Sequence, residues 1–423
     1  MMSWVLFCLW FALFLVLLRK FTKIIFPKFN FLFITTLWII KILAGTFIWF
    51  IYQFYYADEK TGDIISYYSD AKELIKIWKE NPRDFIDVIL GIAGNHENRY
   101  ADLYNNMRYW YEEWKGSNLI IEPRNMIRLN AIISLLGGGL FHTNTLFYSF
   151  FSYIGILLLI WAFLRNSKDT QPEWMLAGTV LFPSVLAWTS AAMRESPMML
   201  GIGLTILGAQ LNREKKWTYG LTSLTVGMWI LVLFKTHVAL TIFLPCVLFI
   251  ASGWLRENML GLYAITFFII LIILYSTTLG DLIFQAIAKK RENFINVSLV
   301  WQARSTVPVP EVPISIIQLP HSFLHALFNS YLQPMPWRIS GVLDALAVME
   351  NIIFLILIVV FILSRKSVLH KFGMDNLLFV VSFLILQGTL IGLTTAVAGA
   401  IVRYKVSALS VVIPFLVGNL QKR

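Results

Sequence analysis

Long runs of apolar residues alternate with short polar segments along the chain, and this pattern predicts an all-α polytopic membrane protein. A helix needs about 20 residues to cross a hydrocarbon layer of about 30 Å, and the runs approach that length. Lipid offers no partners to unpaired backbone groups, and the runs show no two-residue alternation, so helices are predicted rather than barrel strands. We predict about eleven transmembrane helices, at residues 3–18, 31–54, 142–163, 173–191, 197–211, 217–234, 238–253, 259–279, 343–364, 376–396 and 402–419.

Composition and charge agree with this class. Of the 423 residues, 58% are hydrophobic and 14% are charged, whereas soluble domains carry about 25% charged residues. The net charge of +11 does not require a nucleic-acid partner, because basic residues gather in short loops, as the positive-inside rule expects of cytoplasmic loops. These residues are Arg19, Lys20, Lys23, Lys28, Arg165, Lys168, Arg213, Lys215, Lys216, Arg256, Arg365, Lys366, Lys371, Lys422 and Arg423. The rule places the N-terminus outside and the C-terminus in the cytoplasm.

Two large loops are predicted outside the cytoplasm, at residues 56–141 and 280–341 of a single transmembrane domain that spans residues 1–423. Neither loop has the strand-rich pattern of a separate folded domain. The first loop alternates charged with aromatic residues, which is typical of helices that lie in the headgroup zone. We expect such amphipathic helices at residues 71–80, 82–91 and 100–114.

The segment after the second predicted span carries the first candidate chemistry. Asp63 and Asp70 are seven residues apart, so on a helix they point the same way. A carboxylate near the membrane surface can accept the proton of a sugar hydroxyl as that hydroxyl attacks, and Asp63 and Asp70 are the catalytic candidates. Two alternatives stand beside this hypothesis. Asp63 can cap the helix N-terminus after Gly62, and Asp70 can be a solvated surface residue.

Cations at the predicted outer ends of spans form the second candidate group. Short outer loops should avoid Lys and Arg, so cations there suggest a site for the phosphate of a lipid-linked leaving group. Snorkelling to headgroups and a local Arg194–Glu195 pair are the alternatives. The candidates for binding the donor phosphate and its carrier are Arg403, Tyr404, Lys405, Lys235, His237, Arg194 and Arg128.

Lys41 lies in the middle of the second predicted span, where a charge is costly and usually paired or functional. Glu350, in the ninth span, is a suggested partner. His321 and His325 share a helical spacing, but no third ligand stands in register, so no metal site is predicted.

Several short motifs resemble the GT-C class of membrane glycosyltransferases. The long first loop with Gly62-Asp63 and Tyr67-Tyr68 is similar to the acidic first loop of that class. Arg403-Tyr404-Lys405 followed by Pro414 resembles the Arg-Tyr…Pro segment of enzymes that use polyprenyl-phosphate sugars. The stretches at 182–195 and 334–337, the latter followed by Glu350-Asn351, look like bacterial surface-polysaccharide membrane proteins.

The resemblance implies an enzyme of the bacterial-type inner membrane with an extracytoplasmic active site. It would transfer a sugar from a polyprenyl-linked donor to a lipid-linked or glycan acceptor, with Asp63 as general base and Arg403 facing the donor phosphate. Such an inverting transfer needs no cofactor, and membrane lipids and polysaccharide-assembly proteins would be the partners. O-antigen and capsule polymerases share many of these features and remain an alternative. A lipid-linked glycan transporter or flippase, and a non-catalytic subunit of an assembly complex, are alternatives from other classes.

Overall fold

The structure is a computed structural model that describes most of the chain. It covers residues 2–55, 63–92, 99–110, 119–167, 171–253, 258–300, 303, 305–339 and 341–418, without the side chains of residues 55 and 365–370. Some predicted features therefore lie outside the described residues. They are the Thr61-Gly62 pair before Asp63, residues 111–114 of the third amphipathic helix, and the basic residues Lys168, Arg256, Lys422 and Arg423, with the side chains of Arg365 and Lys366.

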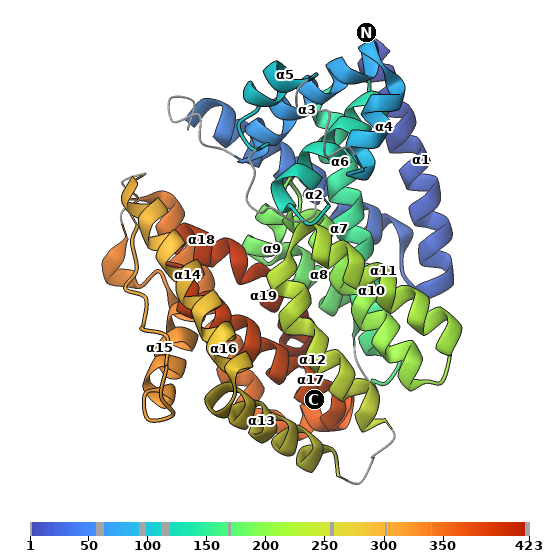
Figure 1. Cartoon of the computed structure of the whole chain (residues 1–423). Coiled ribbons are helices and arrows are strands. Elements are labelled where there is room, and N and C mark those ends of the chain that lie inside the picture. Colours follow the sequence, from blue (N-terminus) through green and yellow to red (C-terminus); the bar gives the residue numbers. More distant parts are fainter. Residues whose placement is uncertain are drawn as a thin grey trace. The chain divides into compact units, whose positions relative to one another are not determined.

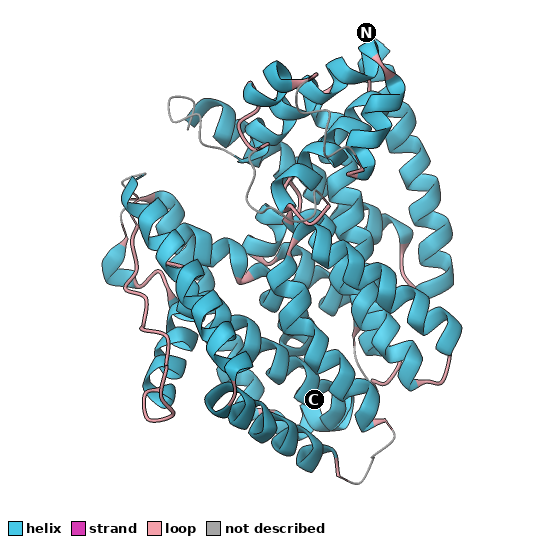
Figure 2. Cartoon of the chain, viewed as in Figure 1, coloured by secondary structure: helices cyan, strands magenta, loops and turns pink. Residues whose placement is uncertain are grey.

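The described residues are mostly helical, and their only β-type pairing is an isolated bridge between Thr306 and Val397 (Figures 1 and 2). The helices are α1 (Met2–Ile25), α2 (Phe31–Phe50), η1 (Ile51–Tyr55), α3 (Asp63–Glu80), α4 (Pro82–Leu90), α5 (Ala101–Asn105), α6 (Glu122–Leu136), α7 (Phe141–Leu164), α8 (Pro172–Leu181), α9 (Pro183–Trp188), α10 (Glu195–Arg213), α11 (Trp217–Phe234), α12 (Thr236–Ser252), α13 (Met259–Ser276), α14 (Thr278–Val300), α15 (Leu319–Leu332), η3 (Pro336–Arg338), α16 (Val342–Leu363), α17 (Arg365–Thr394), α18 (Ala398–Tyr404) and α19 (Val406–Gly418).

Seven of the described helices are long and apolar enough to cross a membrane, namely α1, α2 with η1, α7, α11, α13, α16 and α17 from Lys371. The bent pair α18–α19 makes an eighth if it forms one span. The prediction of a polytopic helical membrane protein is thus supported. Each of the eleven predicted segments coincides with a helix or a helix pair, but the count of eleven crossings stays a prediction.

Two predicted spans are broken helices. Phe182 is extended (φ −62°, ψ 125°) between α8 and α9, as the residue before a proline prefers to be, and Pro183 begins α9. The axes of α18 and α19 differ by 53° across the break at Lys405. The break between α8 and α9 is thus explained by local backbone chemistry.

The first predicted loop contains more helix than expected. The predicted helix at 71–80 begins earlier, at Asp63, and the one at 82–91 agrees with α4. The expectation of a helix over 100–114 is wrong for its middle part, because α5 ends at Asn105 and residues 106–110 are not helical. Helix α6, at Glu122–Leu136, was not predicted.

The chain divides into two compact units. Unit 1 comprises Met1–Trp161, Val185–Thr205 and Ser223–Ala239. Within it α3 packs against α4, α5 and α6, and α1 contacts α2. Helices α7 and α10 approach so closely that a Cβ built on Gly155 would lie 2.2 Å from the Met199 carbonyl oxygen. Small residues at such crossings let backbones meet, as is common between membrane helices.

Unit 2 comprises Ala162–Ser184, Ile206–Thr222 and Leu240–Arg423. Within it α17 contacts α13, α14, α15, α16, α18 and α19, while α19 also packs against α8 and α16. Helix α19, which lies within the predicted span at 402–419, is almost entirely buried. This unit therefore has its own core around α17 and α19.

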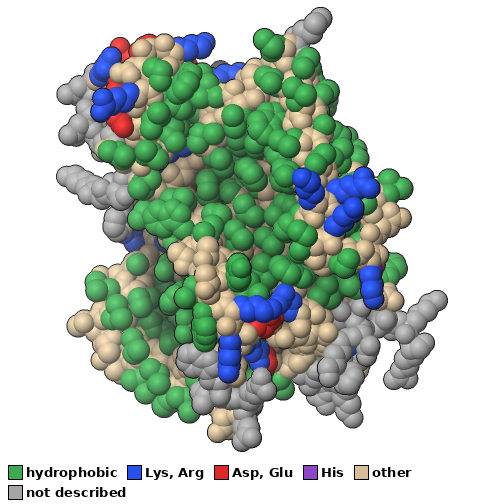
Figure 3. All heavy atoms as spheres, turned by 90° about the vertical axis from the view of Figure 1, so that its right-hand side faces the viewer, with side chains coloured by type: hydrophobic (Ala, Val, Ile, Leu, Met, Phe, Trp, Pro, Cys, Tyr) green, Lys and Arg blue, Asp and Glu red, His purple; other side chains and the backbone are tan. Residues whose placement is uncertain are grey.

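Large hydrophobic side chains are exposed along several helices. They include Leu9 and Val16 of α1, Phe268 of α13 and Ile356 of α16. On the face shown in Figure 3, hydrophobic side chains form a wide area, and Lys and Arg side chains stand in a few separate groups. Exposed apolar surface of this extent indicates contact with lipid.

Candidate functional site

The Asp63 carboxylate lies at the first residue of α3, in unit 1, beside polar side chains from two other segments. The Tyr109 hydroxyl donates to Asp63 Oδ1 at 3.0 Å. Arg194 Nη2 lies 3.9 Å from Asp63 Oδ2. The Asp63 side chain keeps 18% of its surface exposed, so the carboxylate is held in place while solvent or a ligand can still reach it.

Asp70 lies two turns further along α3 and fixes the neighbouring loop. Its Oδ1 accepts from the Arg108 backbone N–H at 3.0 Å, and its Oδ2 accepts from the Tyr109 N–H at 2.8 Å. Burial raises the pKa of this carboxyl, whereas the two backbone donors lower it. Asp70 is buried, so the interpretation of a solvated surface residue is wrong. Both carboxylates therefore accept hydrogen bonds from the same loop residue, Tyr109.

Arg194 connects Asp63 to a carboxylate that the sequence did not single out. Its Nη1 donates to Glu122 Oε2 at 2.8 Å, and the other Glu122 oxygen accepts from the Thr236 backbone N–H at 2.8 Å. Glu122 begins α6 and Thr236 begins α12. Two acids thus surround one guanidinium, and the Arg194 side chain remains 17% exposed.

The neighbouring cation Lys235 is already neutralised inside the protein. Its Nζ lies 2.8 Å from Glu195 Oε1, and both side chains are almost fully buried. Glu195 follows Arg194 directly, and each residue has a long-range partner, in the pairs Arg194–Glu122 and Lys235–Glu195. His237, the second residue of α12, is half-buried, and its predicted role at a donor phosphate stays a prediction. Lys235 is therefore placed to stabilise the fold rather than to meet an external phosphate.

Arg128 ties α6 to α4. Its Nε donates to the Val88 carbonyl at 2.9 Å, near the C-terminus of α4, where a cation also complements the helix dipole. Its guanidinium carbon lies 5.3 Å from the centroid of the Trp110 ring, and that of Arg124 lies 5.0 Å from the same ring. Burial, and then repulsion from Arg124, lowers the pKa of Arg128 to about 10. Arg128 remains charged at neutral pH and is buried in this scaffold.

A second polar cluster lies in unit 2 around Lys405. Lys405 Nζ donates to Asn351 Oδ1 and lies 3.5 Å from Glu350 Oε1. The other Glu350 oxygen accepts from the Ser184 N–H at 2.5 Å, at the break between α8 and α9. Asn351 Nδ2 donates to the carbonyls of Leu332 and Pro334.

The cluster joins four stretches of the sequence that carried the resemblance, from residues 182–195, 334–337, 350–351 and 403–405. Lys405, Glu350 and Asn351 are all buried. Like Lys235, Lys405 therefore has a carboxylate partner within the protein. Its predicted role at a donor phosphate stays a prediction, and its contacts are those of a residue that holds the core together.

Arg403 and Tyr404, at the end of α18, are both half-buried. The Tyr404 ring packs against the cluster of Val307, Ile391, Ala398 and Ile401, with the Phe294 ring centroid 6.0 Å away. The structure thus gives Tyr404 a packing role, and the predicted roles of both residues toward a donor stay predictions.

Lys41 is fully buried in α2 and caps the end of α9. Its Nζ donates to Thr189 Oγ1 at 2.7 Å and faces the Thr189 carbonyl oxygen at 3.4 Å. The suggestion that Glu350 pairs with Lys41 is wrong, because Glu350 pairs with Lys405. A cation just past a helix C-terminus satisfies carbonyls that have no partner within the helix.

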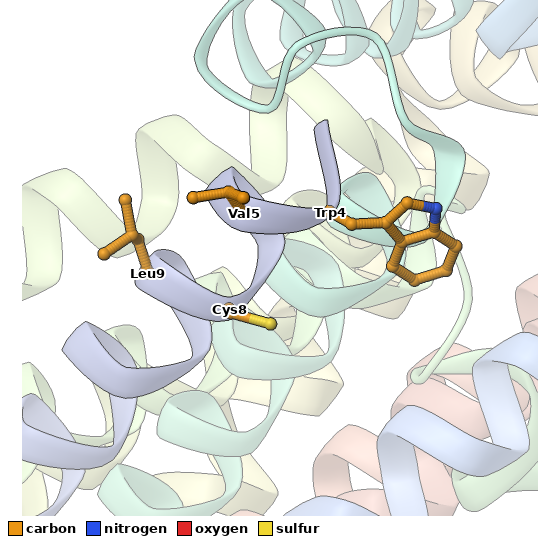
Figure 4. A pocket seen from close by; sticks show the side chains of 4 residues that line it. All are labelled: Trp4, Val5, Cys8 and Leu9. Carbon is orange, nitrogen blue, oxygen red and sulfur yellow. The ribbon is translucent and has the colours of Figure 1, made fainter. Parts of the chain in front are cut away.

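A cavity of about 450 Å³ beside α1 is not a candidate site. Trp4, Val5, Cys8 and Leu9, all from α1, line it (Figure 4). These side chains offer no charge, and their only polar groups are the Trp4 indole N–H and the Cys8 thiol, so they are poorly suited to orient a polar substrate. The cavity suits a surface that faces lipid tails.

Three residues that contact the predicted site residues were not themselves predicted from the sequence. Tyr109, Glu122 and Glu195 complete the contacts of Asp63, Arg194 and Lys235. Only Glu122 carried a local signal, since an acidic residue before Pro123 is typical of a helix start. Searches with this chain find no matching family model, no matching curated protein and no matching solved structure.

Proposed function

We propose that the chain is an integral membrane glycosyltransferase that uses a polyprenyl-linked donor and acts on the extracytoplasmic face in cell-surface polysaccharide assembly. The observation that carries the proposal is the Asp63 carboxylate, which is partly exposed and oriented by Tyr109 and Arg194. A general base needs a fixed position and access to its substrate, and Asp63 has both. The resemblance of the loop around Asp63 to the GT-C class supplies the substrate class.

In the proposed reaction Asp63 removes the proton of an acceptor hydroxyl. The acceptor oxygen then forms a bond to the anomeric carbon of the donor sugar, while the bond from that carbon to the phosphate oxygen breaks. The phosphate leaves as an anion on the carrier lipid, and the configuration at the anomeric carbon inverts. Arg194 lies next to Asp63 and is the cation in unit 1 best placed to stabilise developing negative charge.

Glu122 keeps Arg194 in a defined position for this role. Its carboxylate binds both the Arg194 guanidinium and the Thr236 N–H, so the arginine is anchored to α6 and α12 together. Lys235 does not contribute a free charge, because Glu195 neutralises it. The role of Arg403 at the donor phosphate comes from the resemblance and is tested by its own variant.

The test uses the protein purified in detergent with polyprenyl-phosphate sugars and polyprenyl-pyrophosphate oligosaccharides, scored by free carrier lipid. Release from a polyprenyl-phosphate sugar that is lost in Asp63→Asn supports single-sugar transfer. Release only from a pyrophosphate oligosaccharide identifies repeat-unit polymerisation, which would use the same base. Glu73→Gln, at a partly exposed residue on the same helix whose carboxylate pairs with Lys76, is the matched control and keeps full activity. Arg403→Gln is measured beside it and is expected to raise the donor KM.

The broken helices favour one competing function, a transporter for lipid-linked glycans. Helix pairs α8–α9 and α18–α19 are interrupted within apolar segments, and transporters often bind substrate at such breaks. Movement of a fluorescent glycolipid across reconstituted vesicles, without carrier release from any donor, would establish that function instead.

A further inference from the structure

A second cavity, in unit 2, has the lining of a sugar-binding pocket. It encloses about 730 Å³, within the range of about 300–1,000 Å³ that is typical of small-molecule sites. Its polar lining consists of Ser305, Thr306, Gln333 and Arg338. Two hydroxyls, an amide and a guanidinium can together donate to and accept from the hydroxyl groups of one ligand.

Gln333 is the residue that points to a ligand. Its side chain is only 4% exposed, and its Oε1 has no hydrogen-bond partner among the described residues. A buried acceptor without a donor destabilises the fold, so such an atom usually binds a ligand or ordered water. A hydroxyl group of the ligand would supply the missing donor.

The remaining wall is apolar, and it includes Val307, Pro334 and Ala398. A pyranose ring presents C–H groups on its faces and hydroxyl groups around its edge, so it needs both kinds of surface. Arg338 is exposed at the pocket and adds a positive charge that a carboxylate or phosphate on the sugar would meet. The chemistry therefore favours an anionic sugar over a neutral one.

The walls are held by bonds that do not involve a ligand. The Val307 N–H donates to the Ala396 carbonyl at 2.8 Å, and the Ala398 N–H donates to the Ser305 carbonyl at 2.9 Å. Asn329 Nδ2 donates to the Pro308 carbonyl at 2.7 Å.

On the other side of the pocket, Asn351 Nδ2 donates to the Pro334 carbonyl at 3.2 Å, and Asn351 is in turn bound by Lys405. The buried Lys405 cluster thus fixes the segment that carries Gln333 and Arg338. A rigid pocket loses little entropy when it binds.

We propose that this pocket binds an acidic sugar residue of the glycan substrate, through Gln333 and Thr306 at its hydroxyls and Arg338 at its anionic group. The inference names the substrate class of the proposed transferase and rests on that function for its biological role. The binding itself depends only on the pocket and can be measured without turnover.

The test measures binding of two disaccharides by ligand-observed NMR to the full chain in nanodiscs. Cellobiouronic acid and cellobiose differ only in a carboxylate that replaces one hydroxymethyl group. The acid should bind roughly 5-fold more tightly, as expected for an exposed ion pair. Arg338→Gln should remove this preference while cellobiose binding stays unchanged.

Two further variants test the hydroxyl contacts. Gln333→Leu and Thr306→Val should each lower the affinity for both sugars by roughly 2- to 10-fold, as expected for the loss of one hydrogen bond. Because Gln333 is buried, gel filtration first checks that its variant is folded, and the exposed Thr306 serves as a variant that leaves the core untouched. The proposal would be overturned if neither sugar binds, or if the wild type and all three variants bind the sugars with equal affinities.

The same titration with Asp63→Asn separates this inference from the proposed function. Sugar binding that survives in Asp63→Asn, together with lost carrier release, agrees with both. If the wild-type protein binds the sugar but releases no carrier lipid, the proposed sugar pocket is supported and the proposed transferase function is refuted. Carrier release without any binding of these sugars refutes the acidic-sugar assignment alone.

Discussion

The buried pair of Lys405 and Glu350 allows a quantitative test of the unit 2 core. Lys405 Nζ lies 3.5 Å from Glu350 Oε1, and both side chains are at most 3% exposed. At an effective dielectric constant of about 20, charges at this distance attract by about 5 kcal/mol, which offsets their loss of hydration. Glu350→Gln keeps an acceptor for the Ser184 N–H but leaves the ammonium uncompensated. We expect a loss of about 3–5 kcal/mol in the free energy of unfolding.

The double variant separates this pairing energy from other losses. Lys405→Met alone should also cost about 3–5 kcal/mol, because it leaves Glu350 buried without its counter-charge. Lys405→Met combined with Glu350→Gln should cost much less than the sum, with a coupling energy of about 2–4 kcal/mol.

Unfolding in mixed detergent–denaturant solutions, followed by circular dichroism, measures all three variants. The partly exposed pair Lys76–Glu73 on α3 is the control, with an expected coupling below about 0.5 kcal/mol. Strictly additive losses at Lys405 and Glu350 would refute the assignment of a coupled buried pair.

Three other predictions address positions in both units. Tyr109→Phe removes the hydroxyl that donates to Asp63, so carrier release should fall about 10-fold while unfolding stability changes by about 1 kcal/mol or less; an unchanged release rate would show that this bond does not orient the base. Burial raises the pKa of Glu214, but bonds from its basic and amide neighbours outweigh that effect and lower it to about 2. After discounting for partial exposure, the Glu214 carboxylate should contribute about 1–2 kcal/mol above pH 4.5, and this contribution is lost as the pH falls toward 2. Thermal unfolding of Glu214→Gln and wild type should therefore converge in acid, and a constant difference would contradict the pairing. Gly155→Ala should lower the free energy of unfolding by about 1–3 kcal/mol, because the new methyl group clashes with α10. Gly261→Ala is the control and should leave that free energy unchanged, because Gly261 has open space around it. Equal unfolding temperatures of the two variants would contradict the close crossing of α7 and α10.

The apolar segments were predictable because each is a local property of the chain. The segments at 142–163 and 259–279, for example, coincide with α7 and α13 within three residues. The breaks within the helices were harder to predict from the sequence. Pro183 explains the break after α8, whereas the turn at Lys405 has no local sequence signal and accompanies its burial beside Glu350 and Asn351.

The candidate site was predictable only in part, for a similar reason. Asp63 and Arg194 stood out because of their positions beside apolar runs. Their partners are distant in sequence: Glu122 is 72 residues from Arg194, and Tyr109 is 46 residues from Asp63. Such pairs depend on how helices pack, which residue spacing does not encode. For the same reason Lys235 looked like a free cation, although Glu195 neutralises it.

We propose above that Asp63 is the general base of a sugar transfer. The most direct measurement compares the rate of carrier release by wild type and Asp63→Asn at saturating donor, with binding of the donor lipid measured on the same samples. We expect a rate about 10²- to 10⁴-fold lower in Asp63→Asn, with lipid binding and unfolding temperature retained. A rate equal to that of the wild type would contradict this proposal.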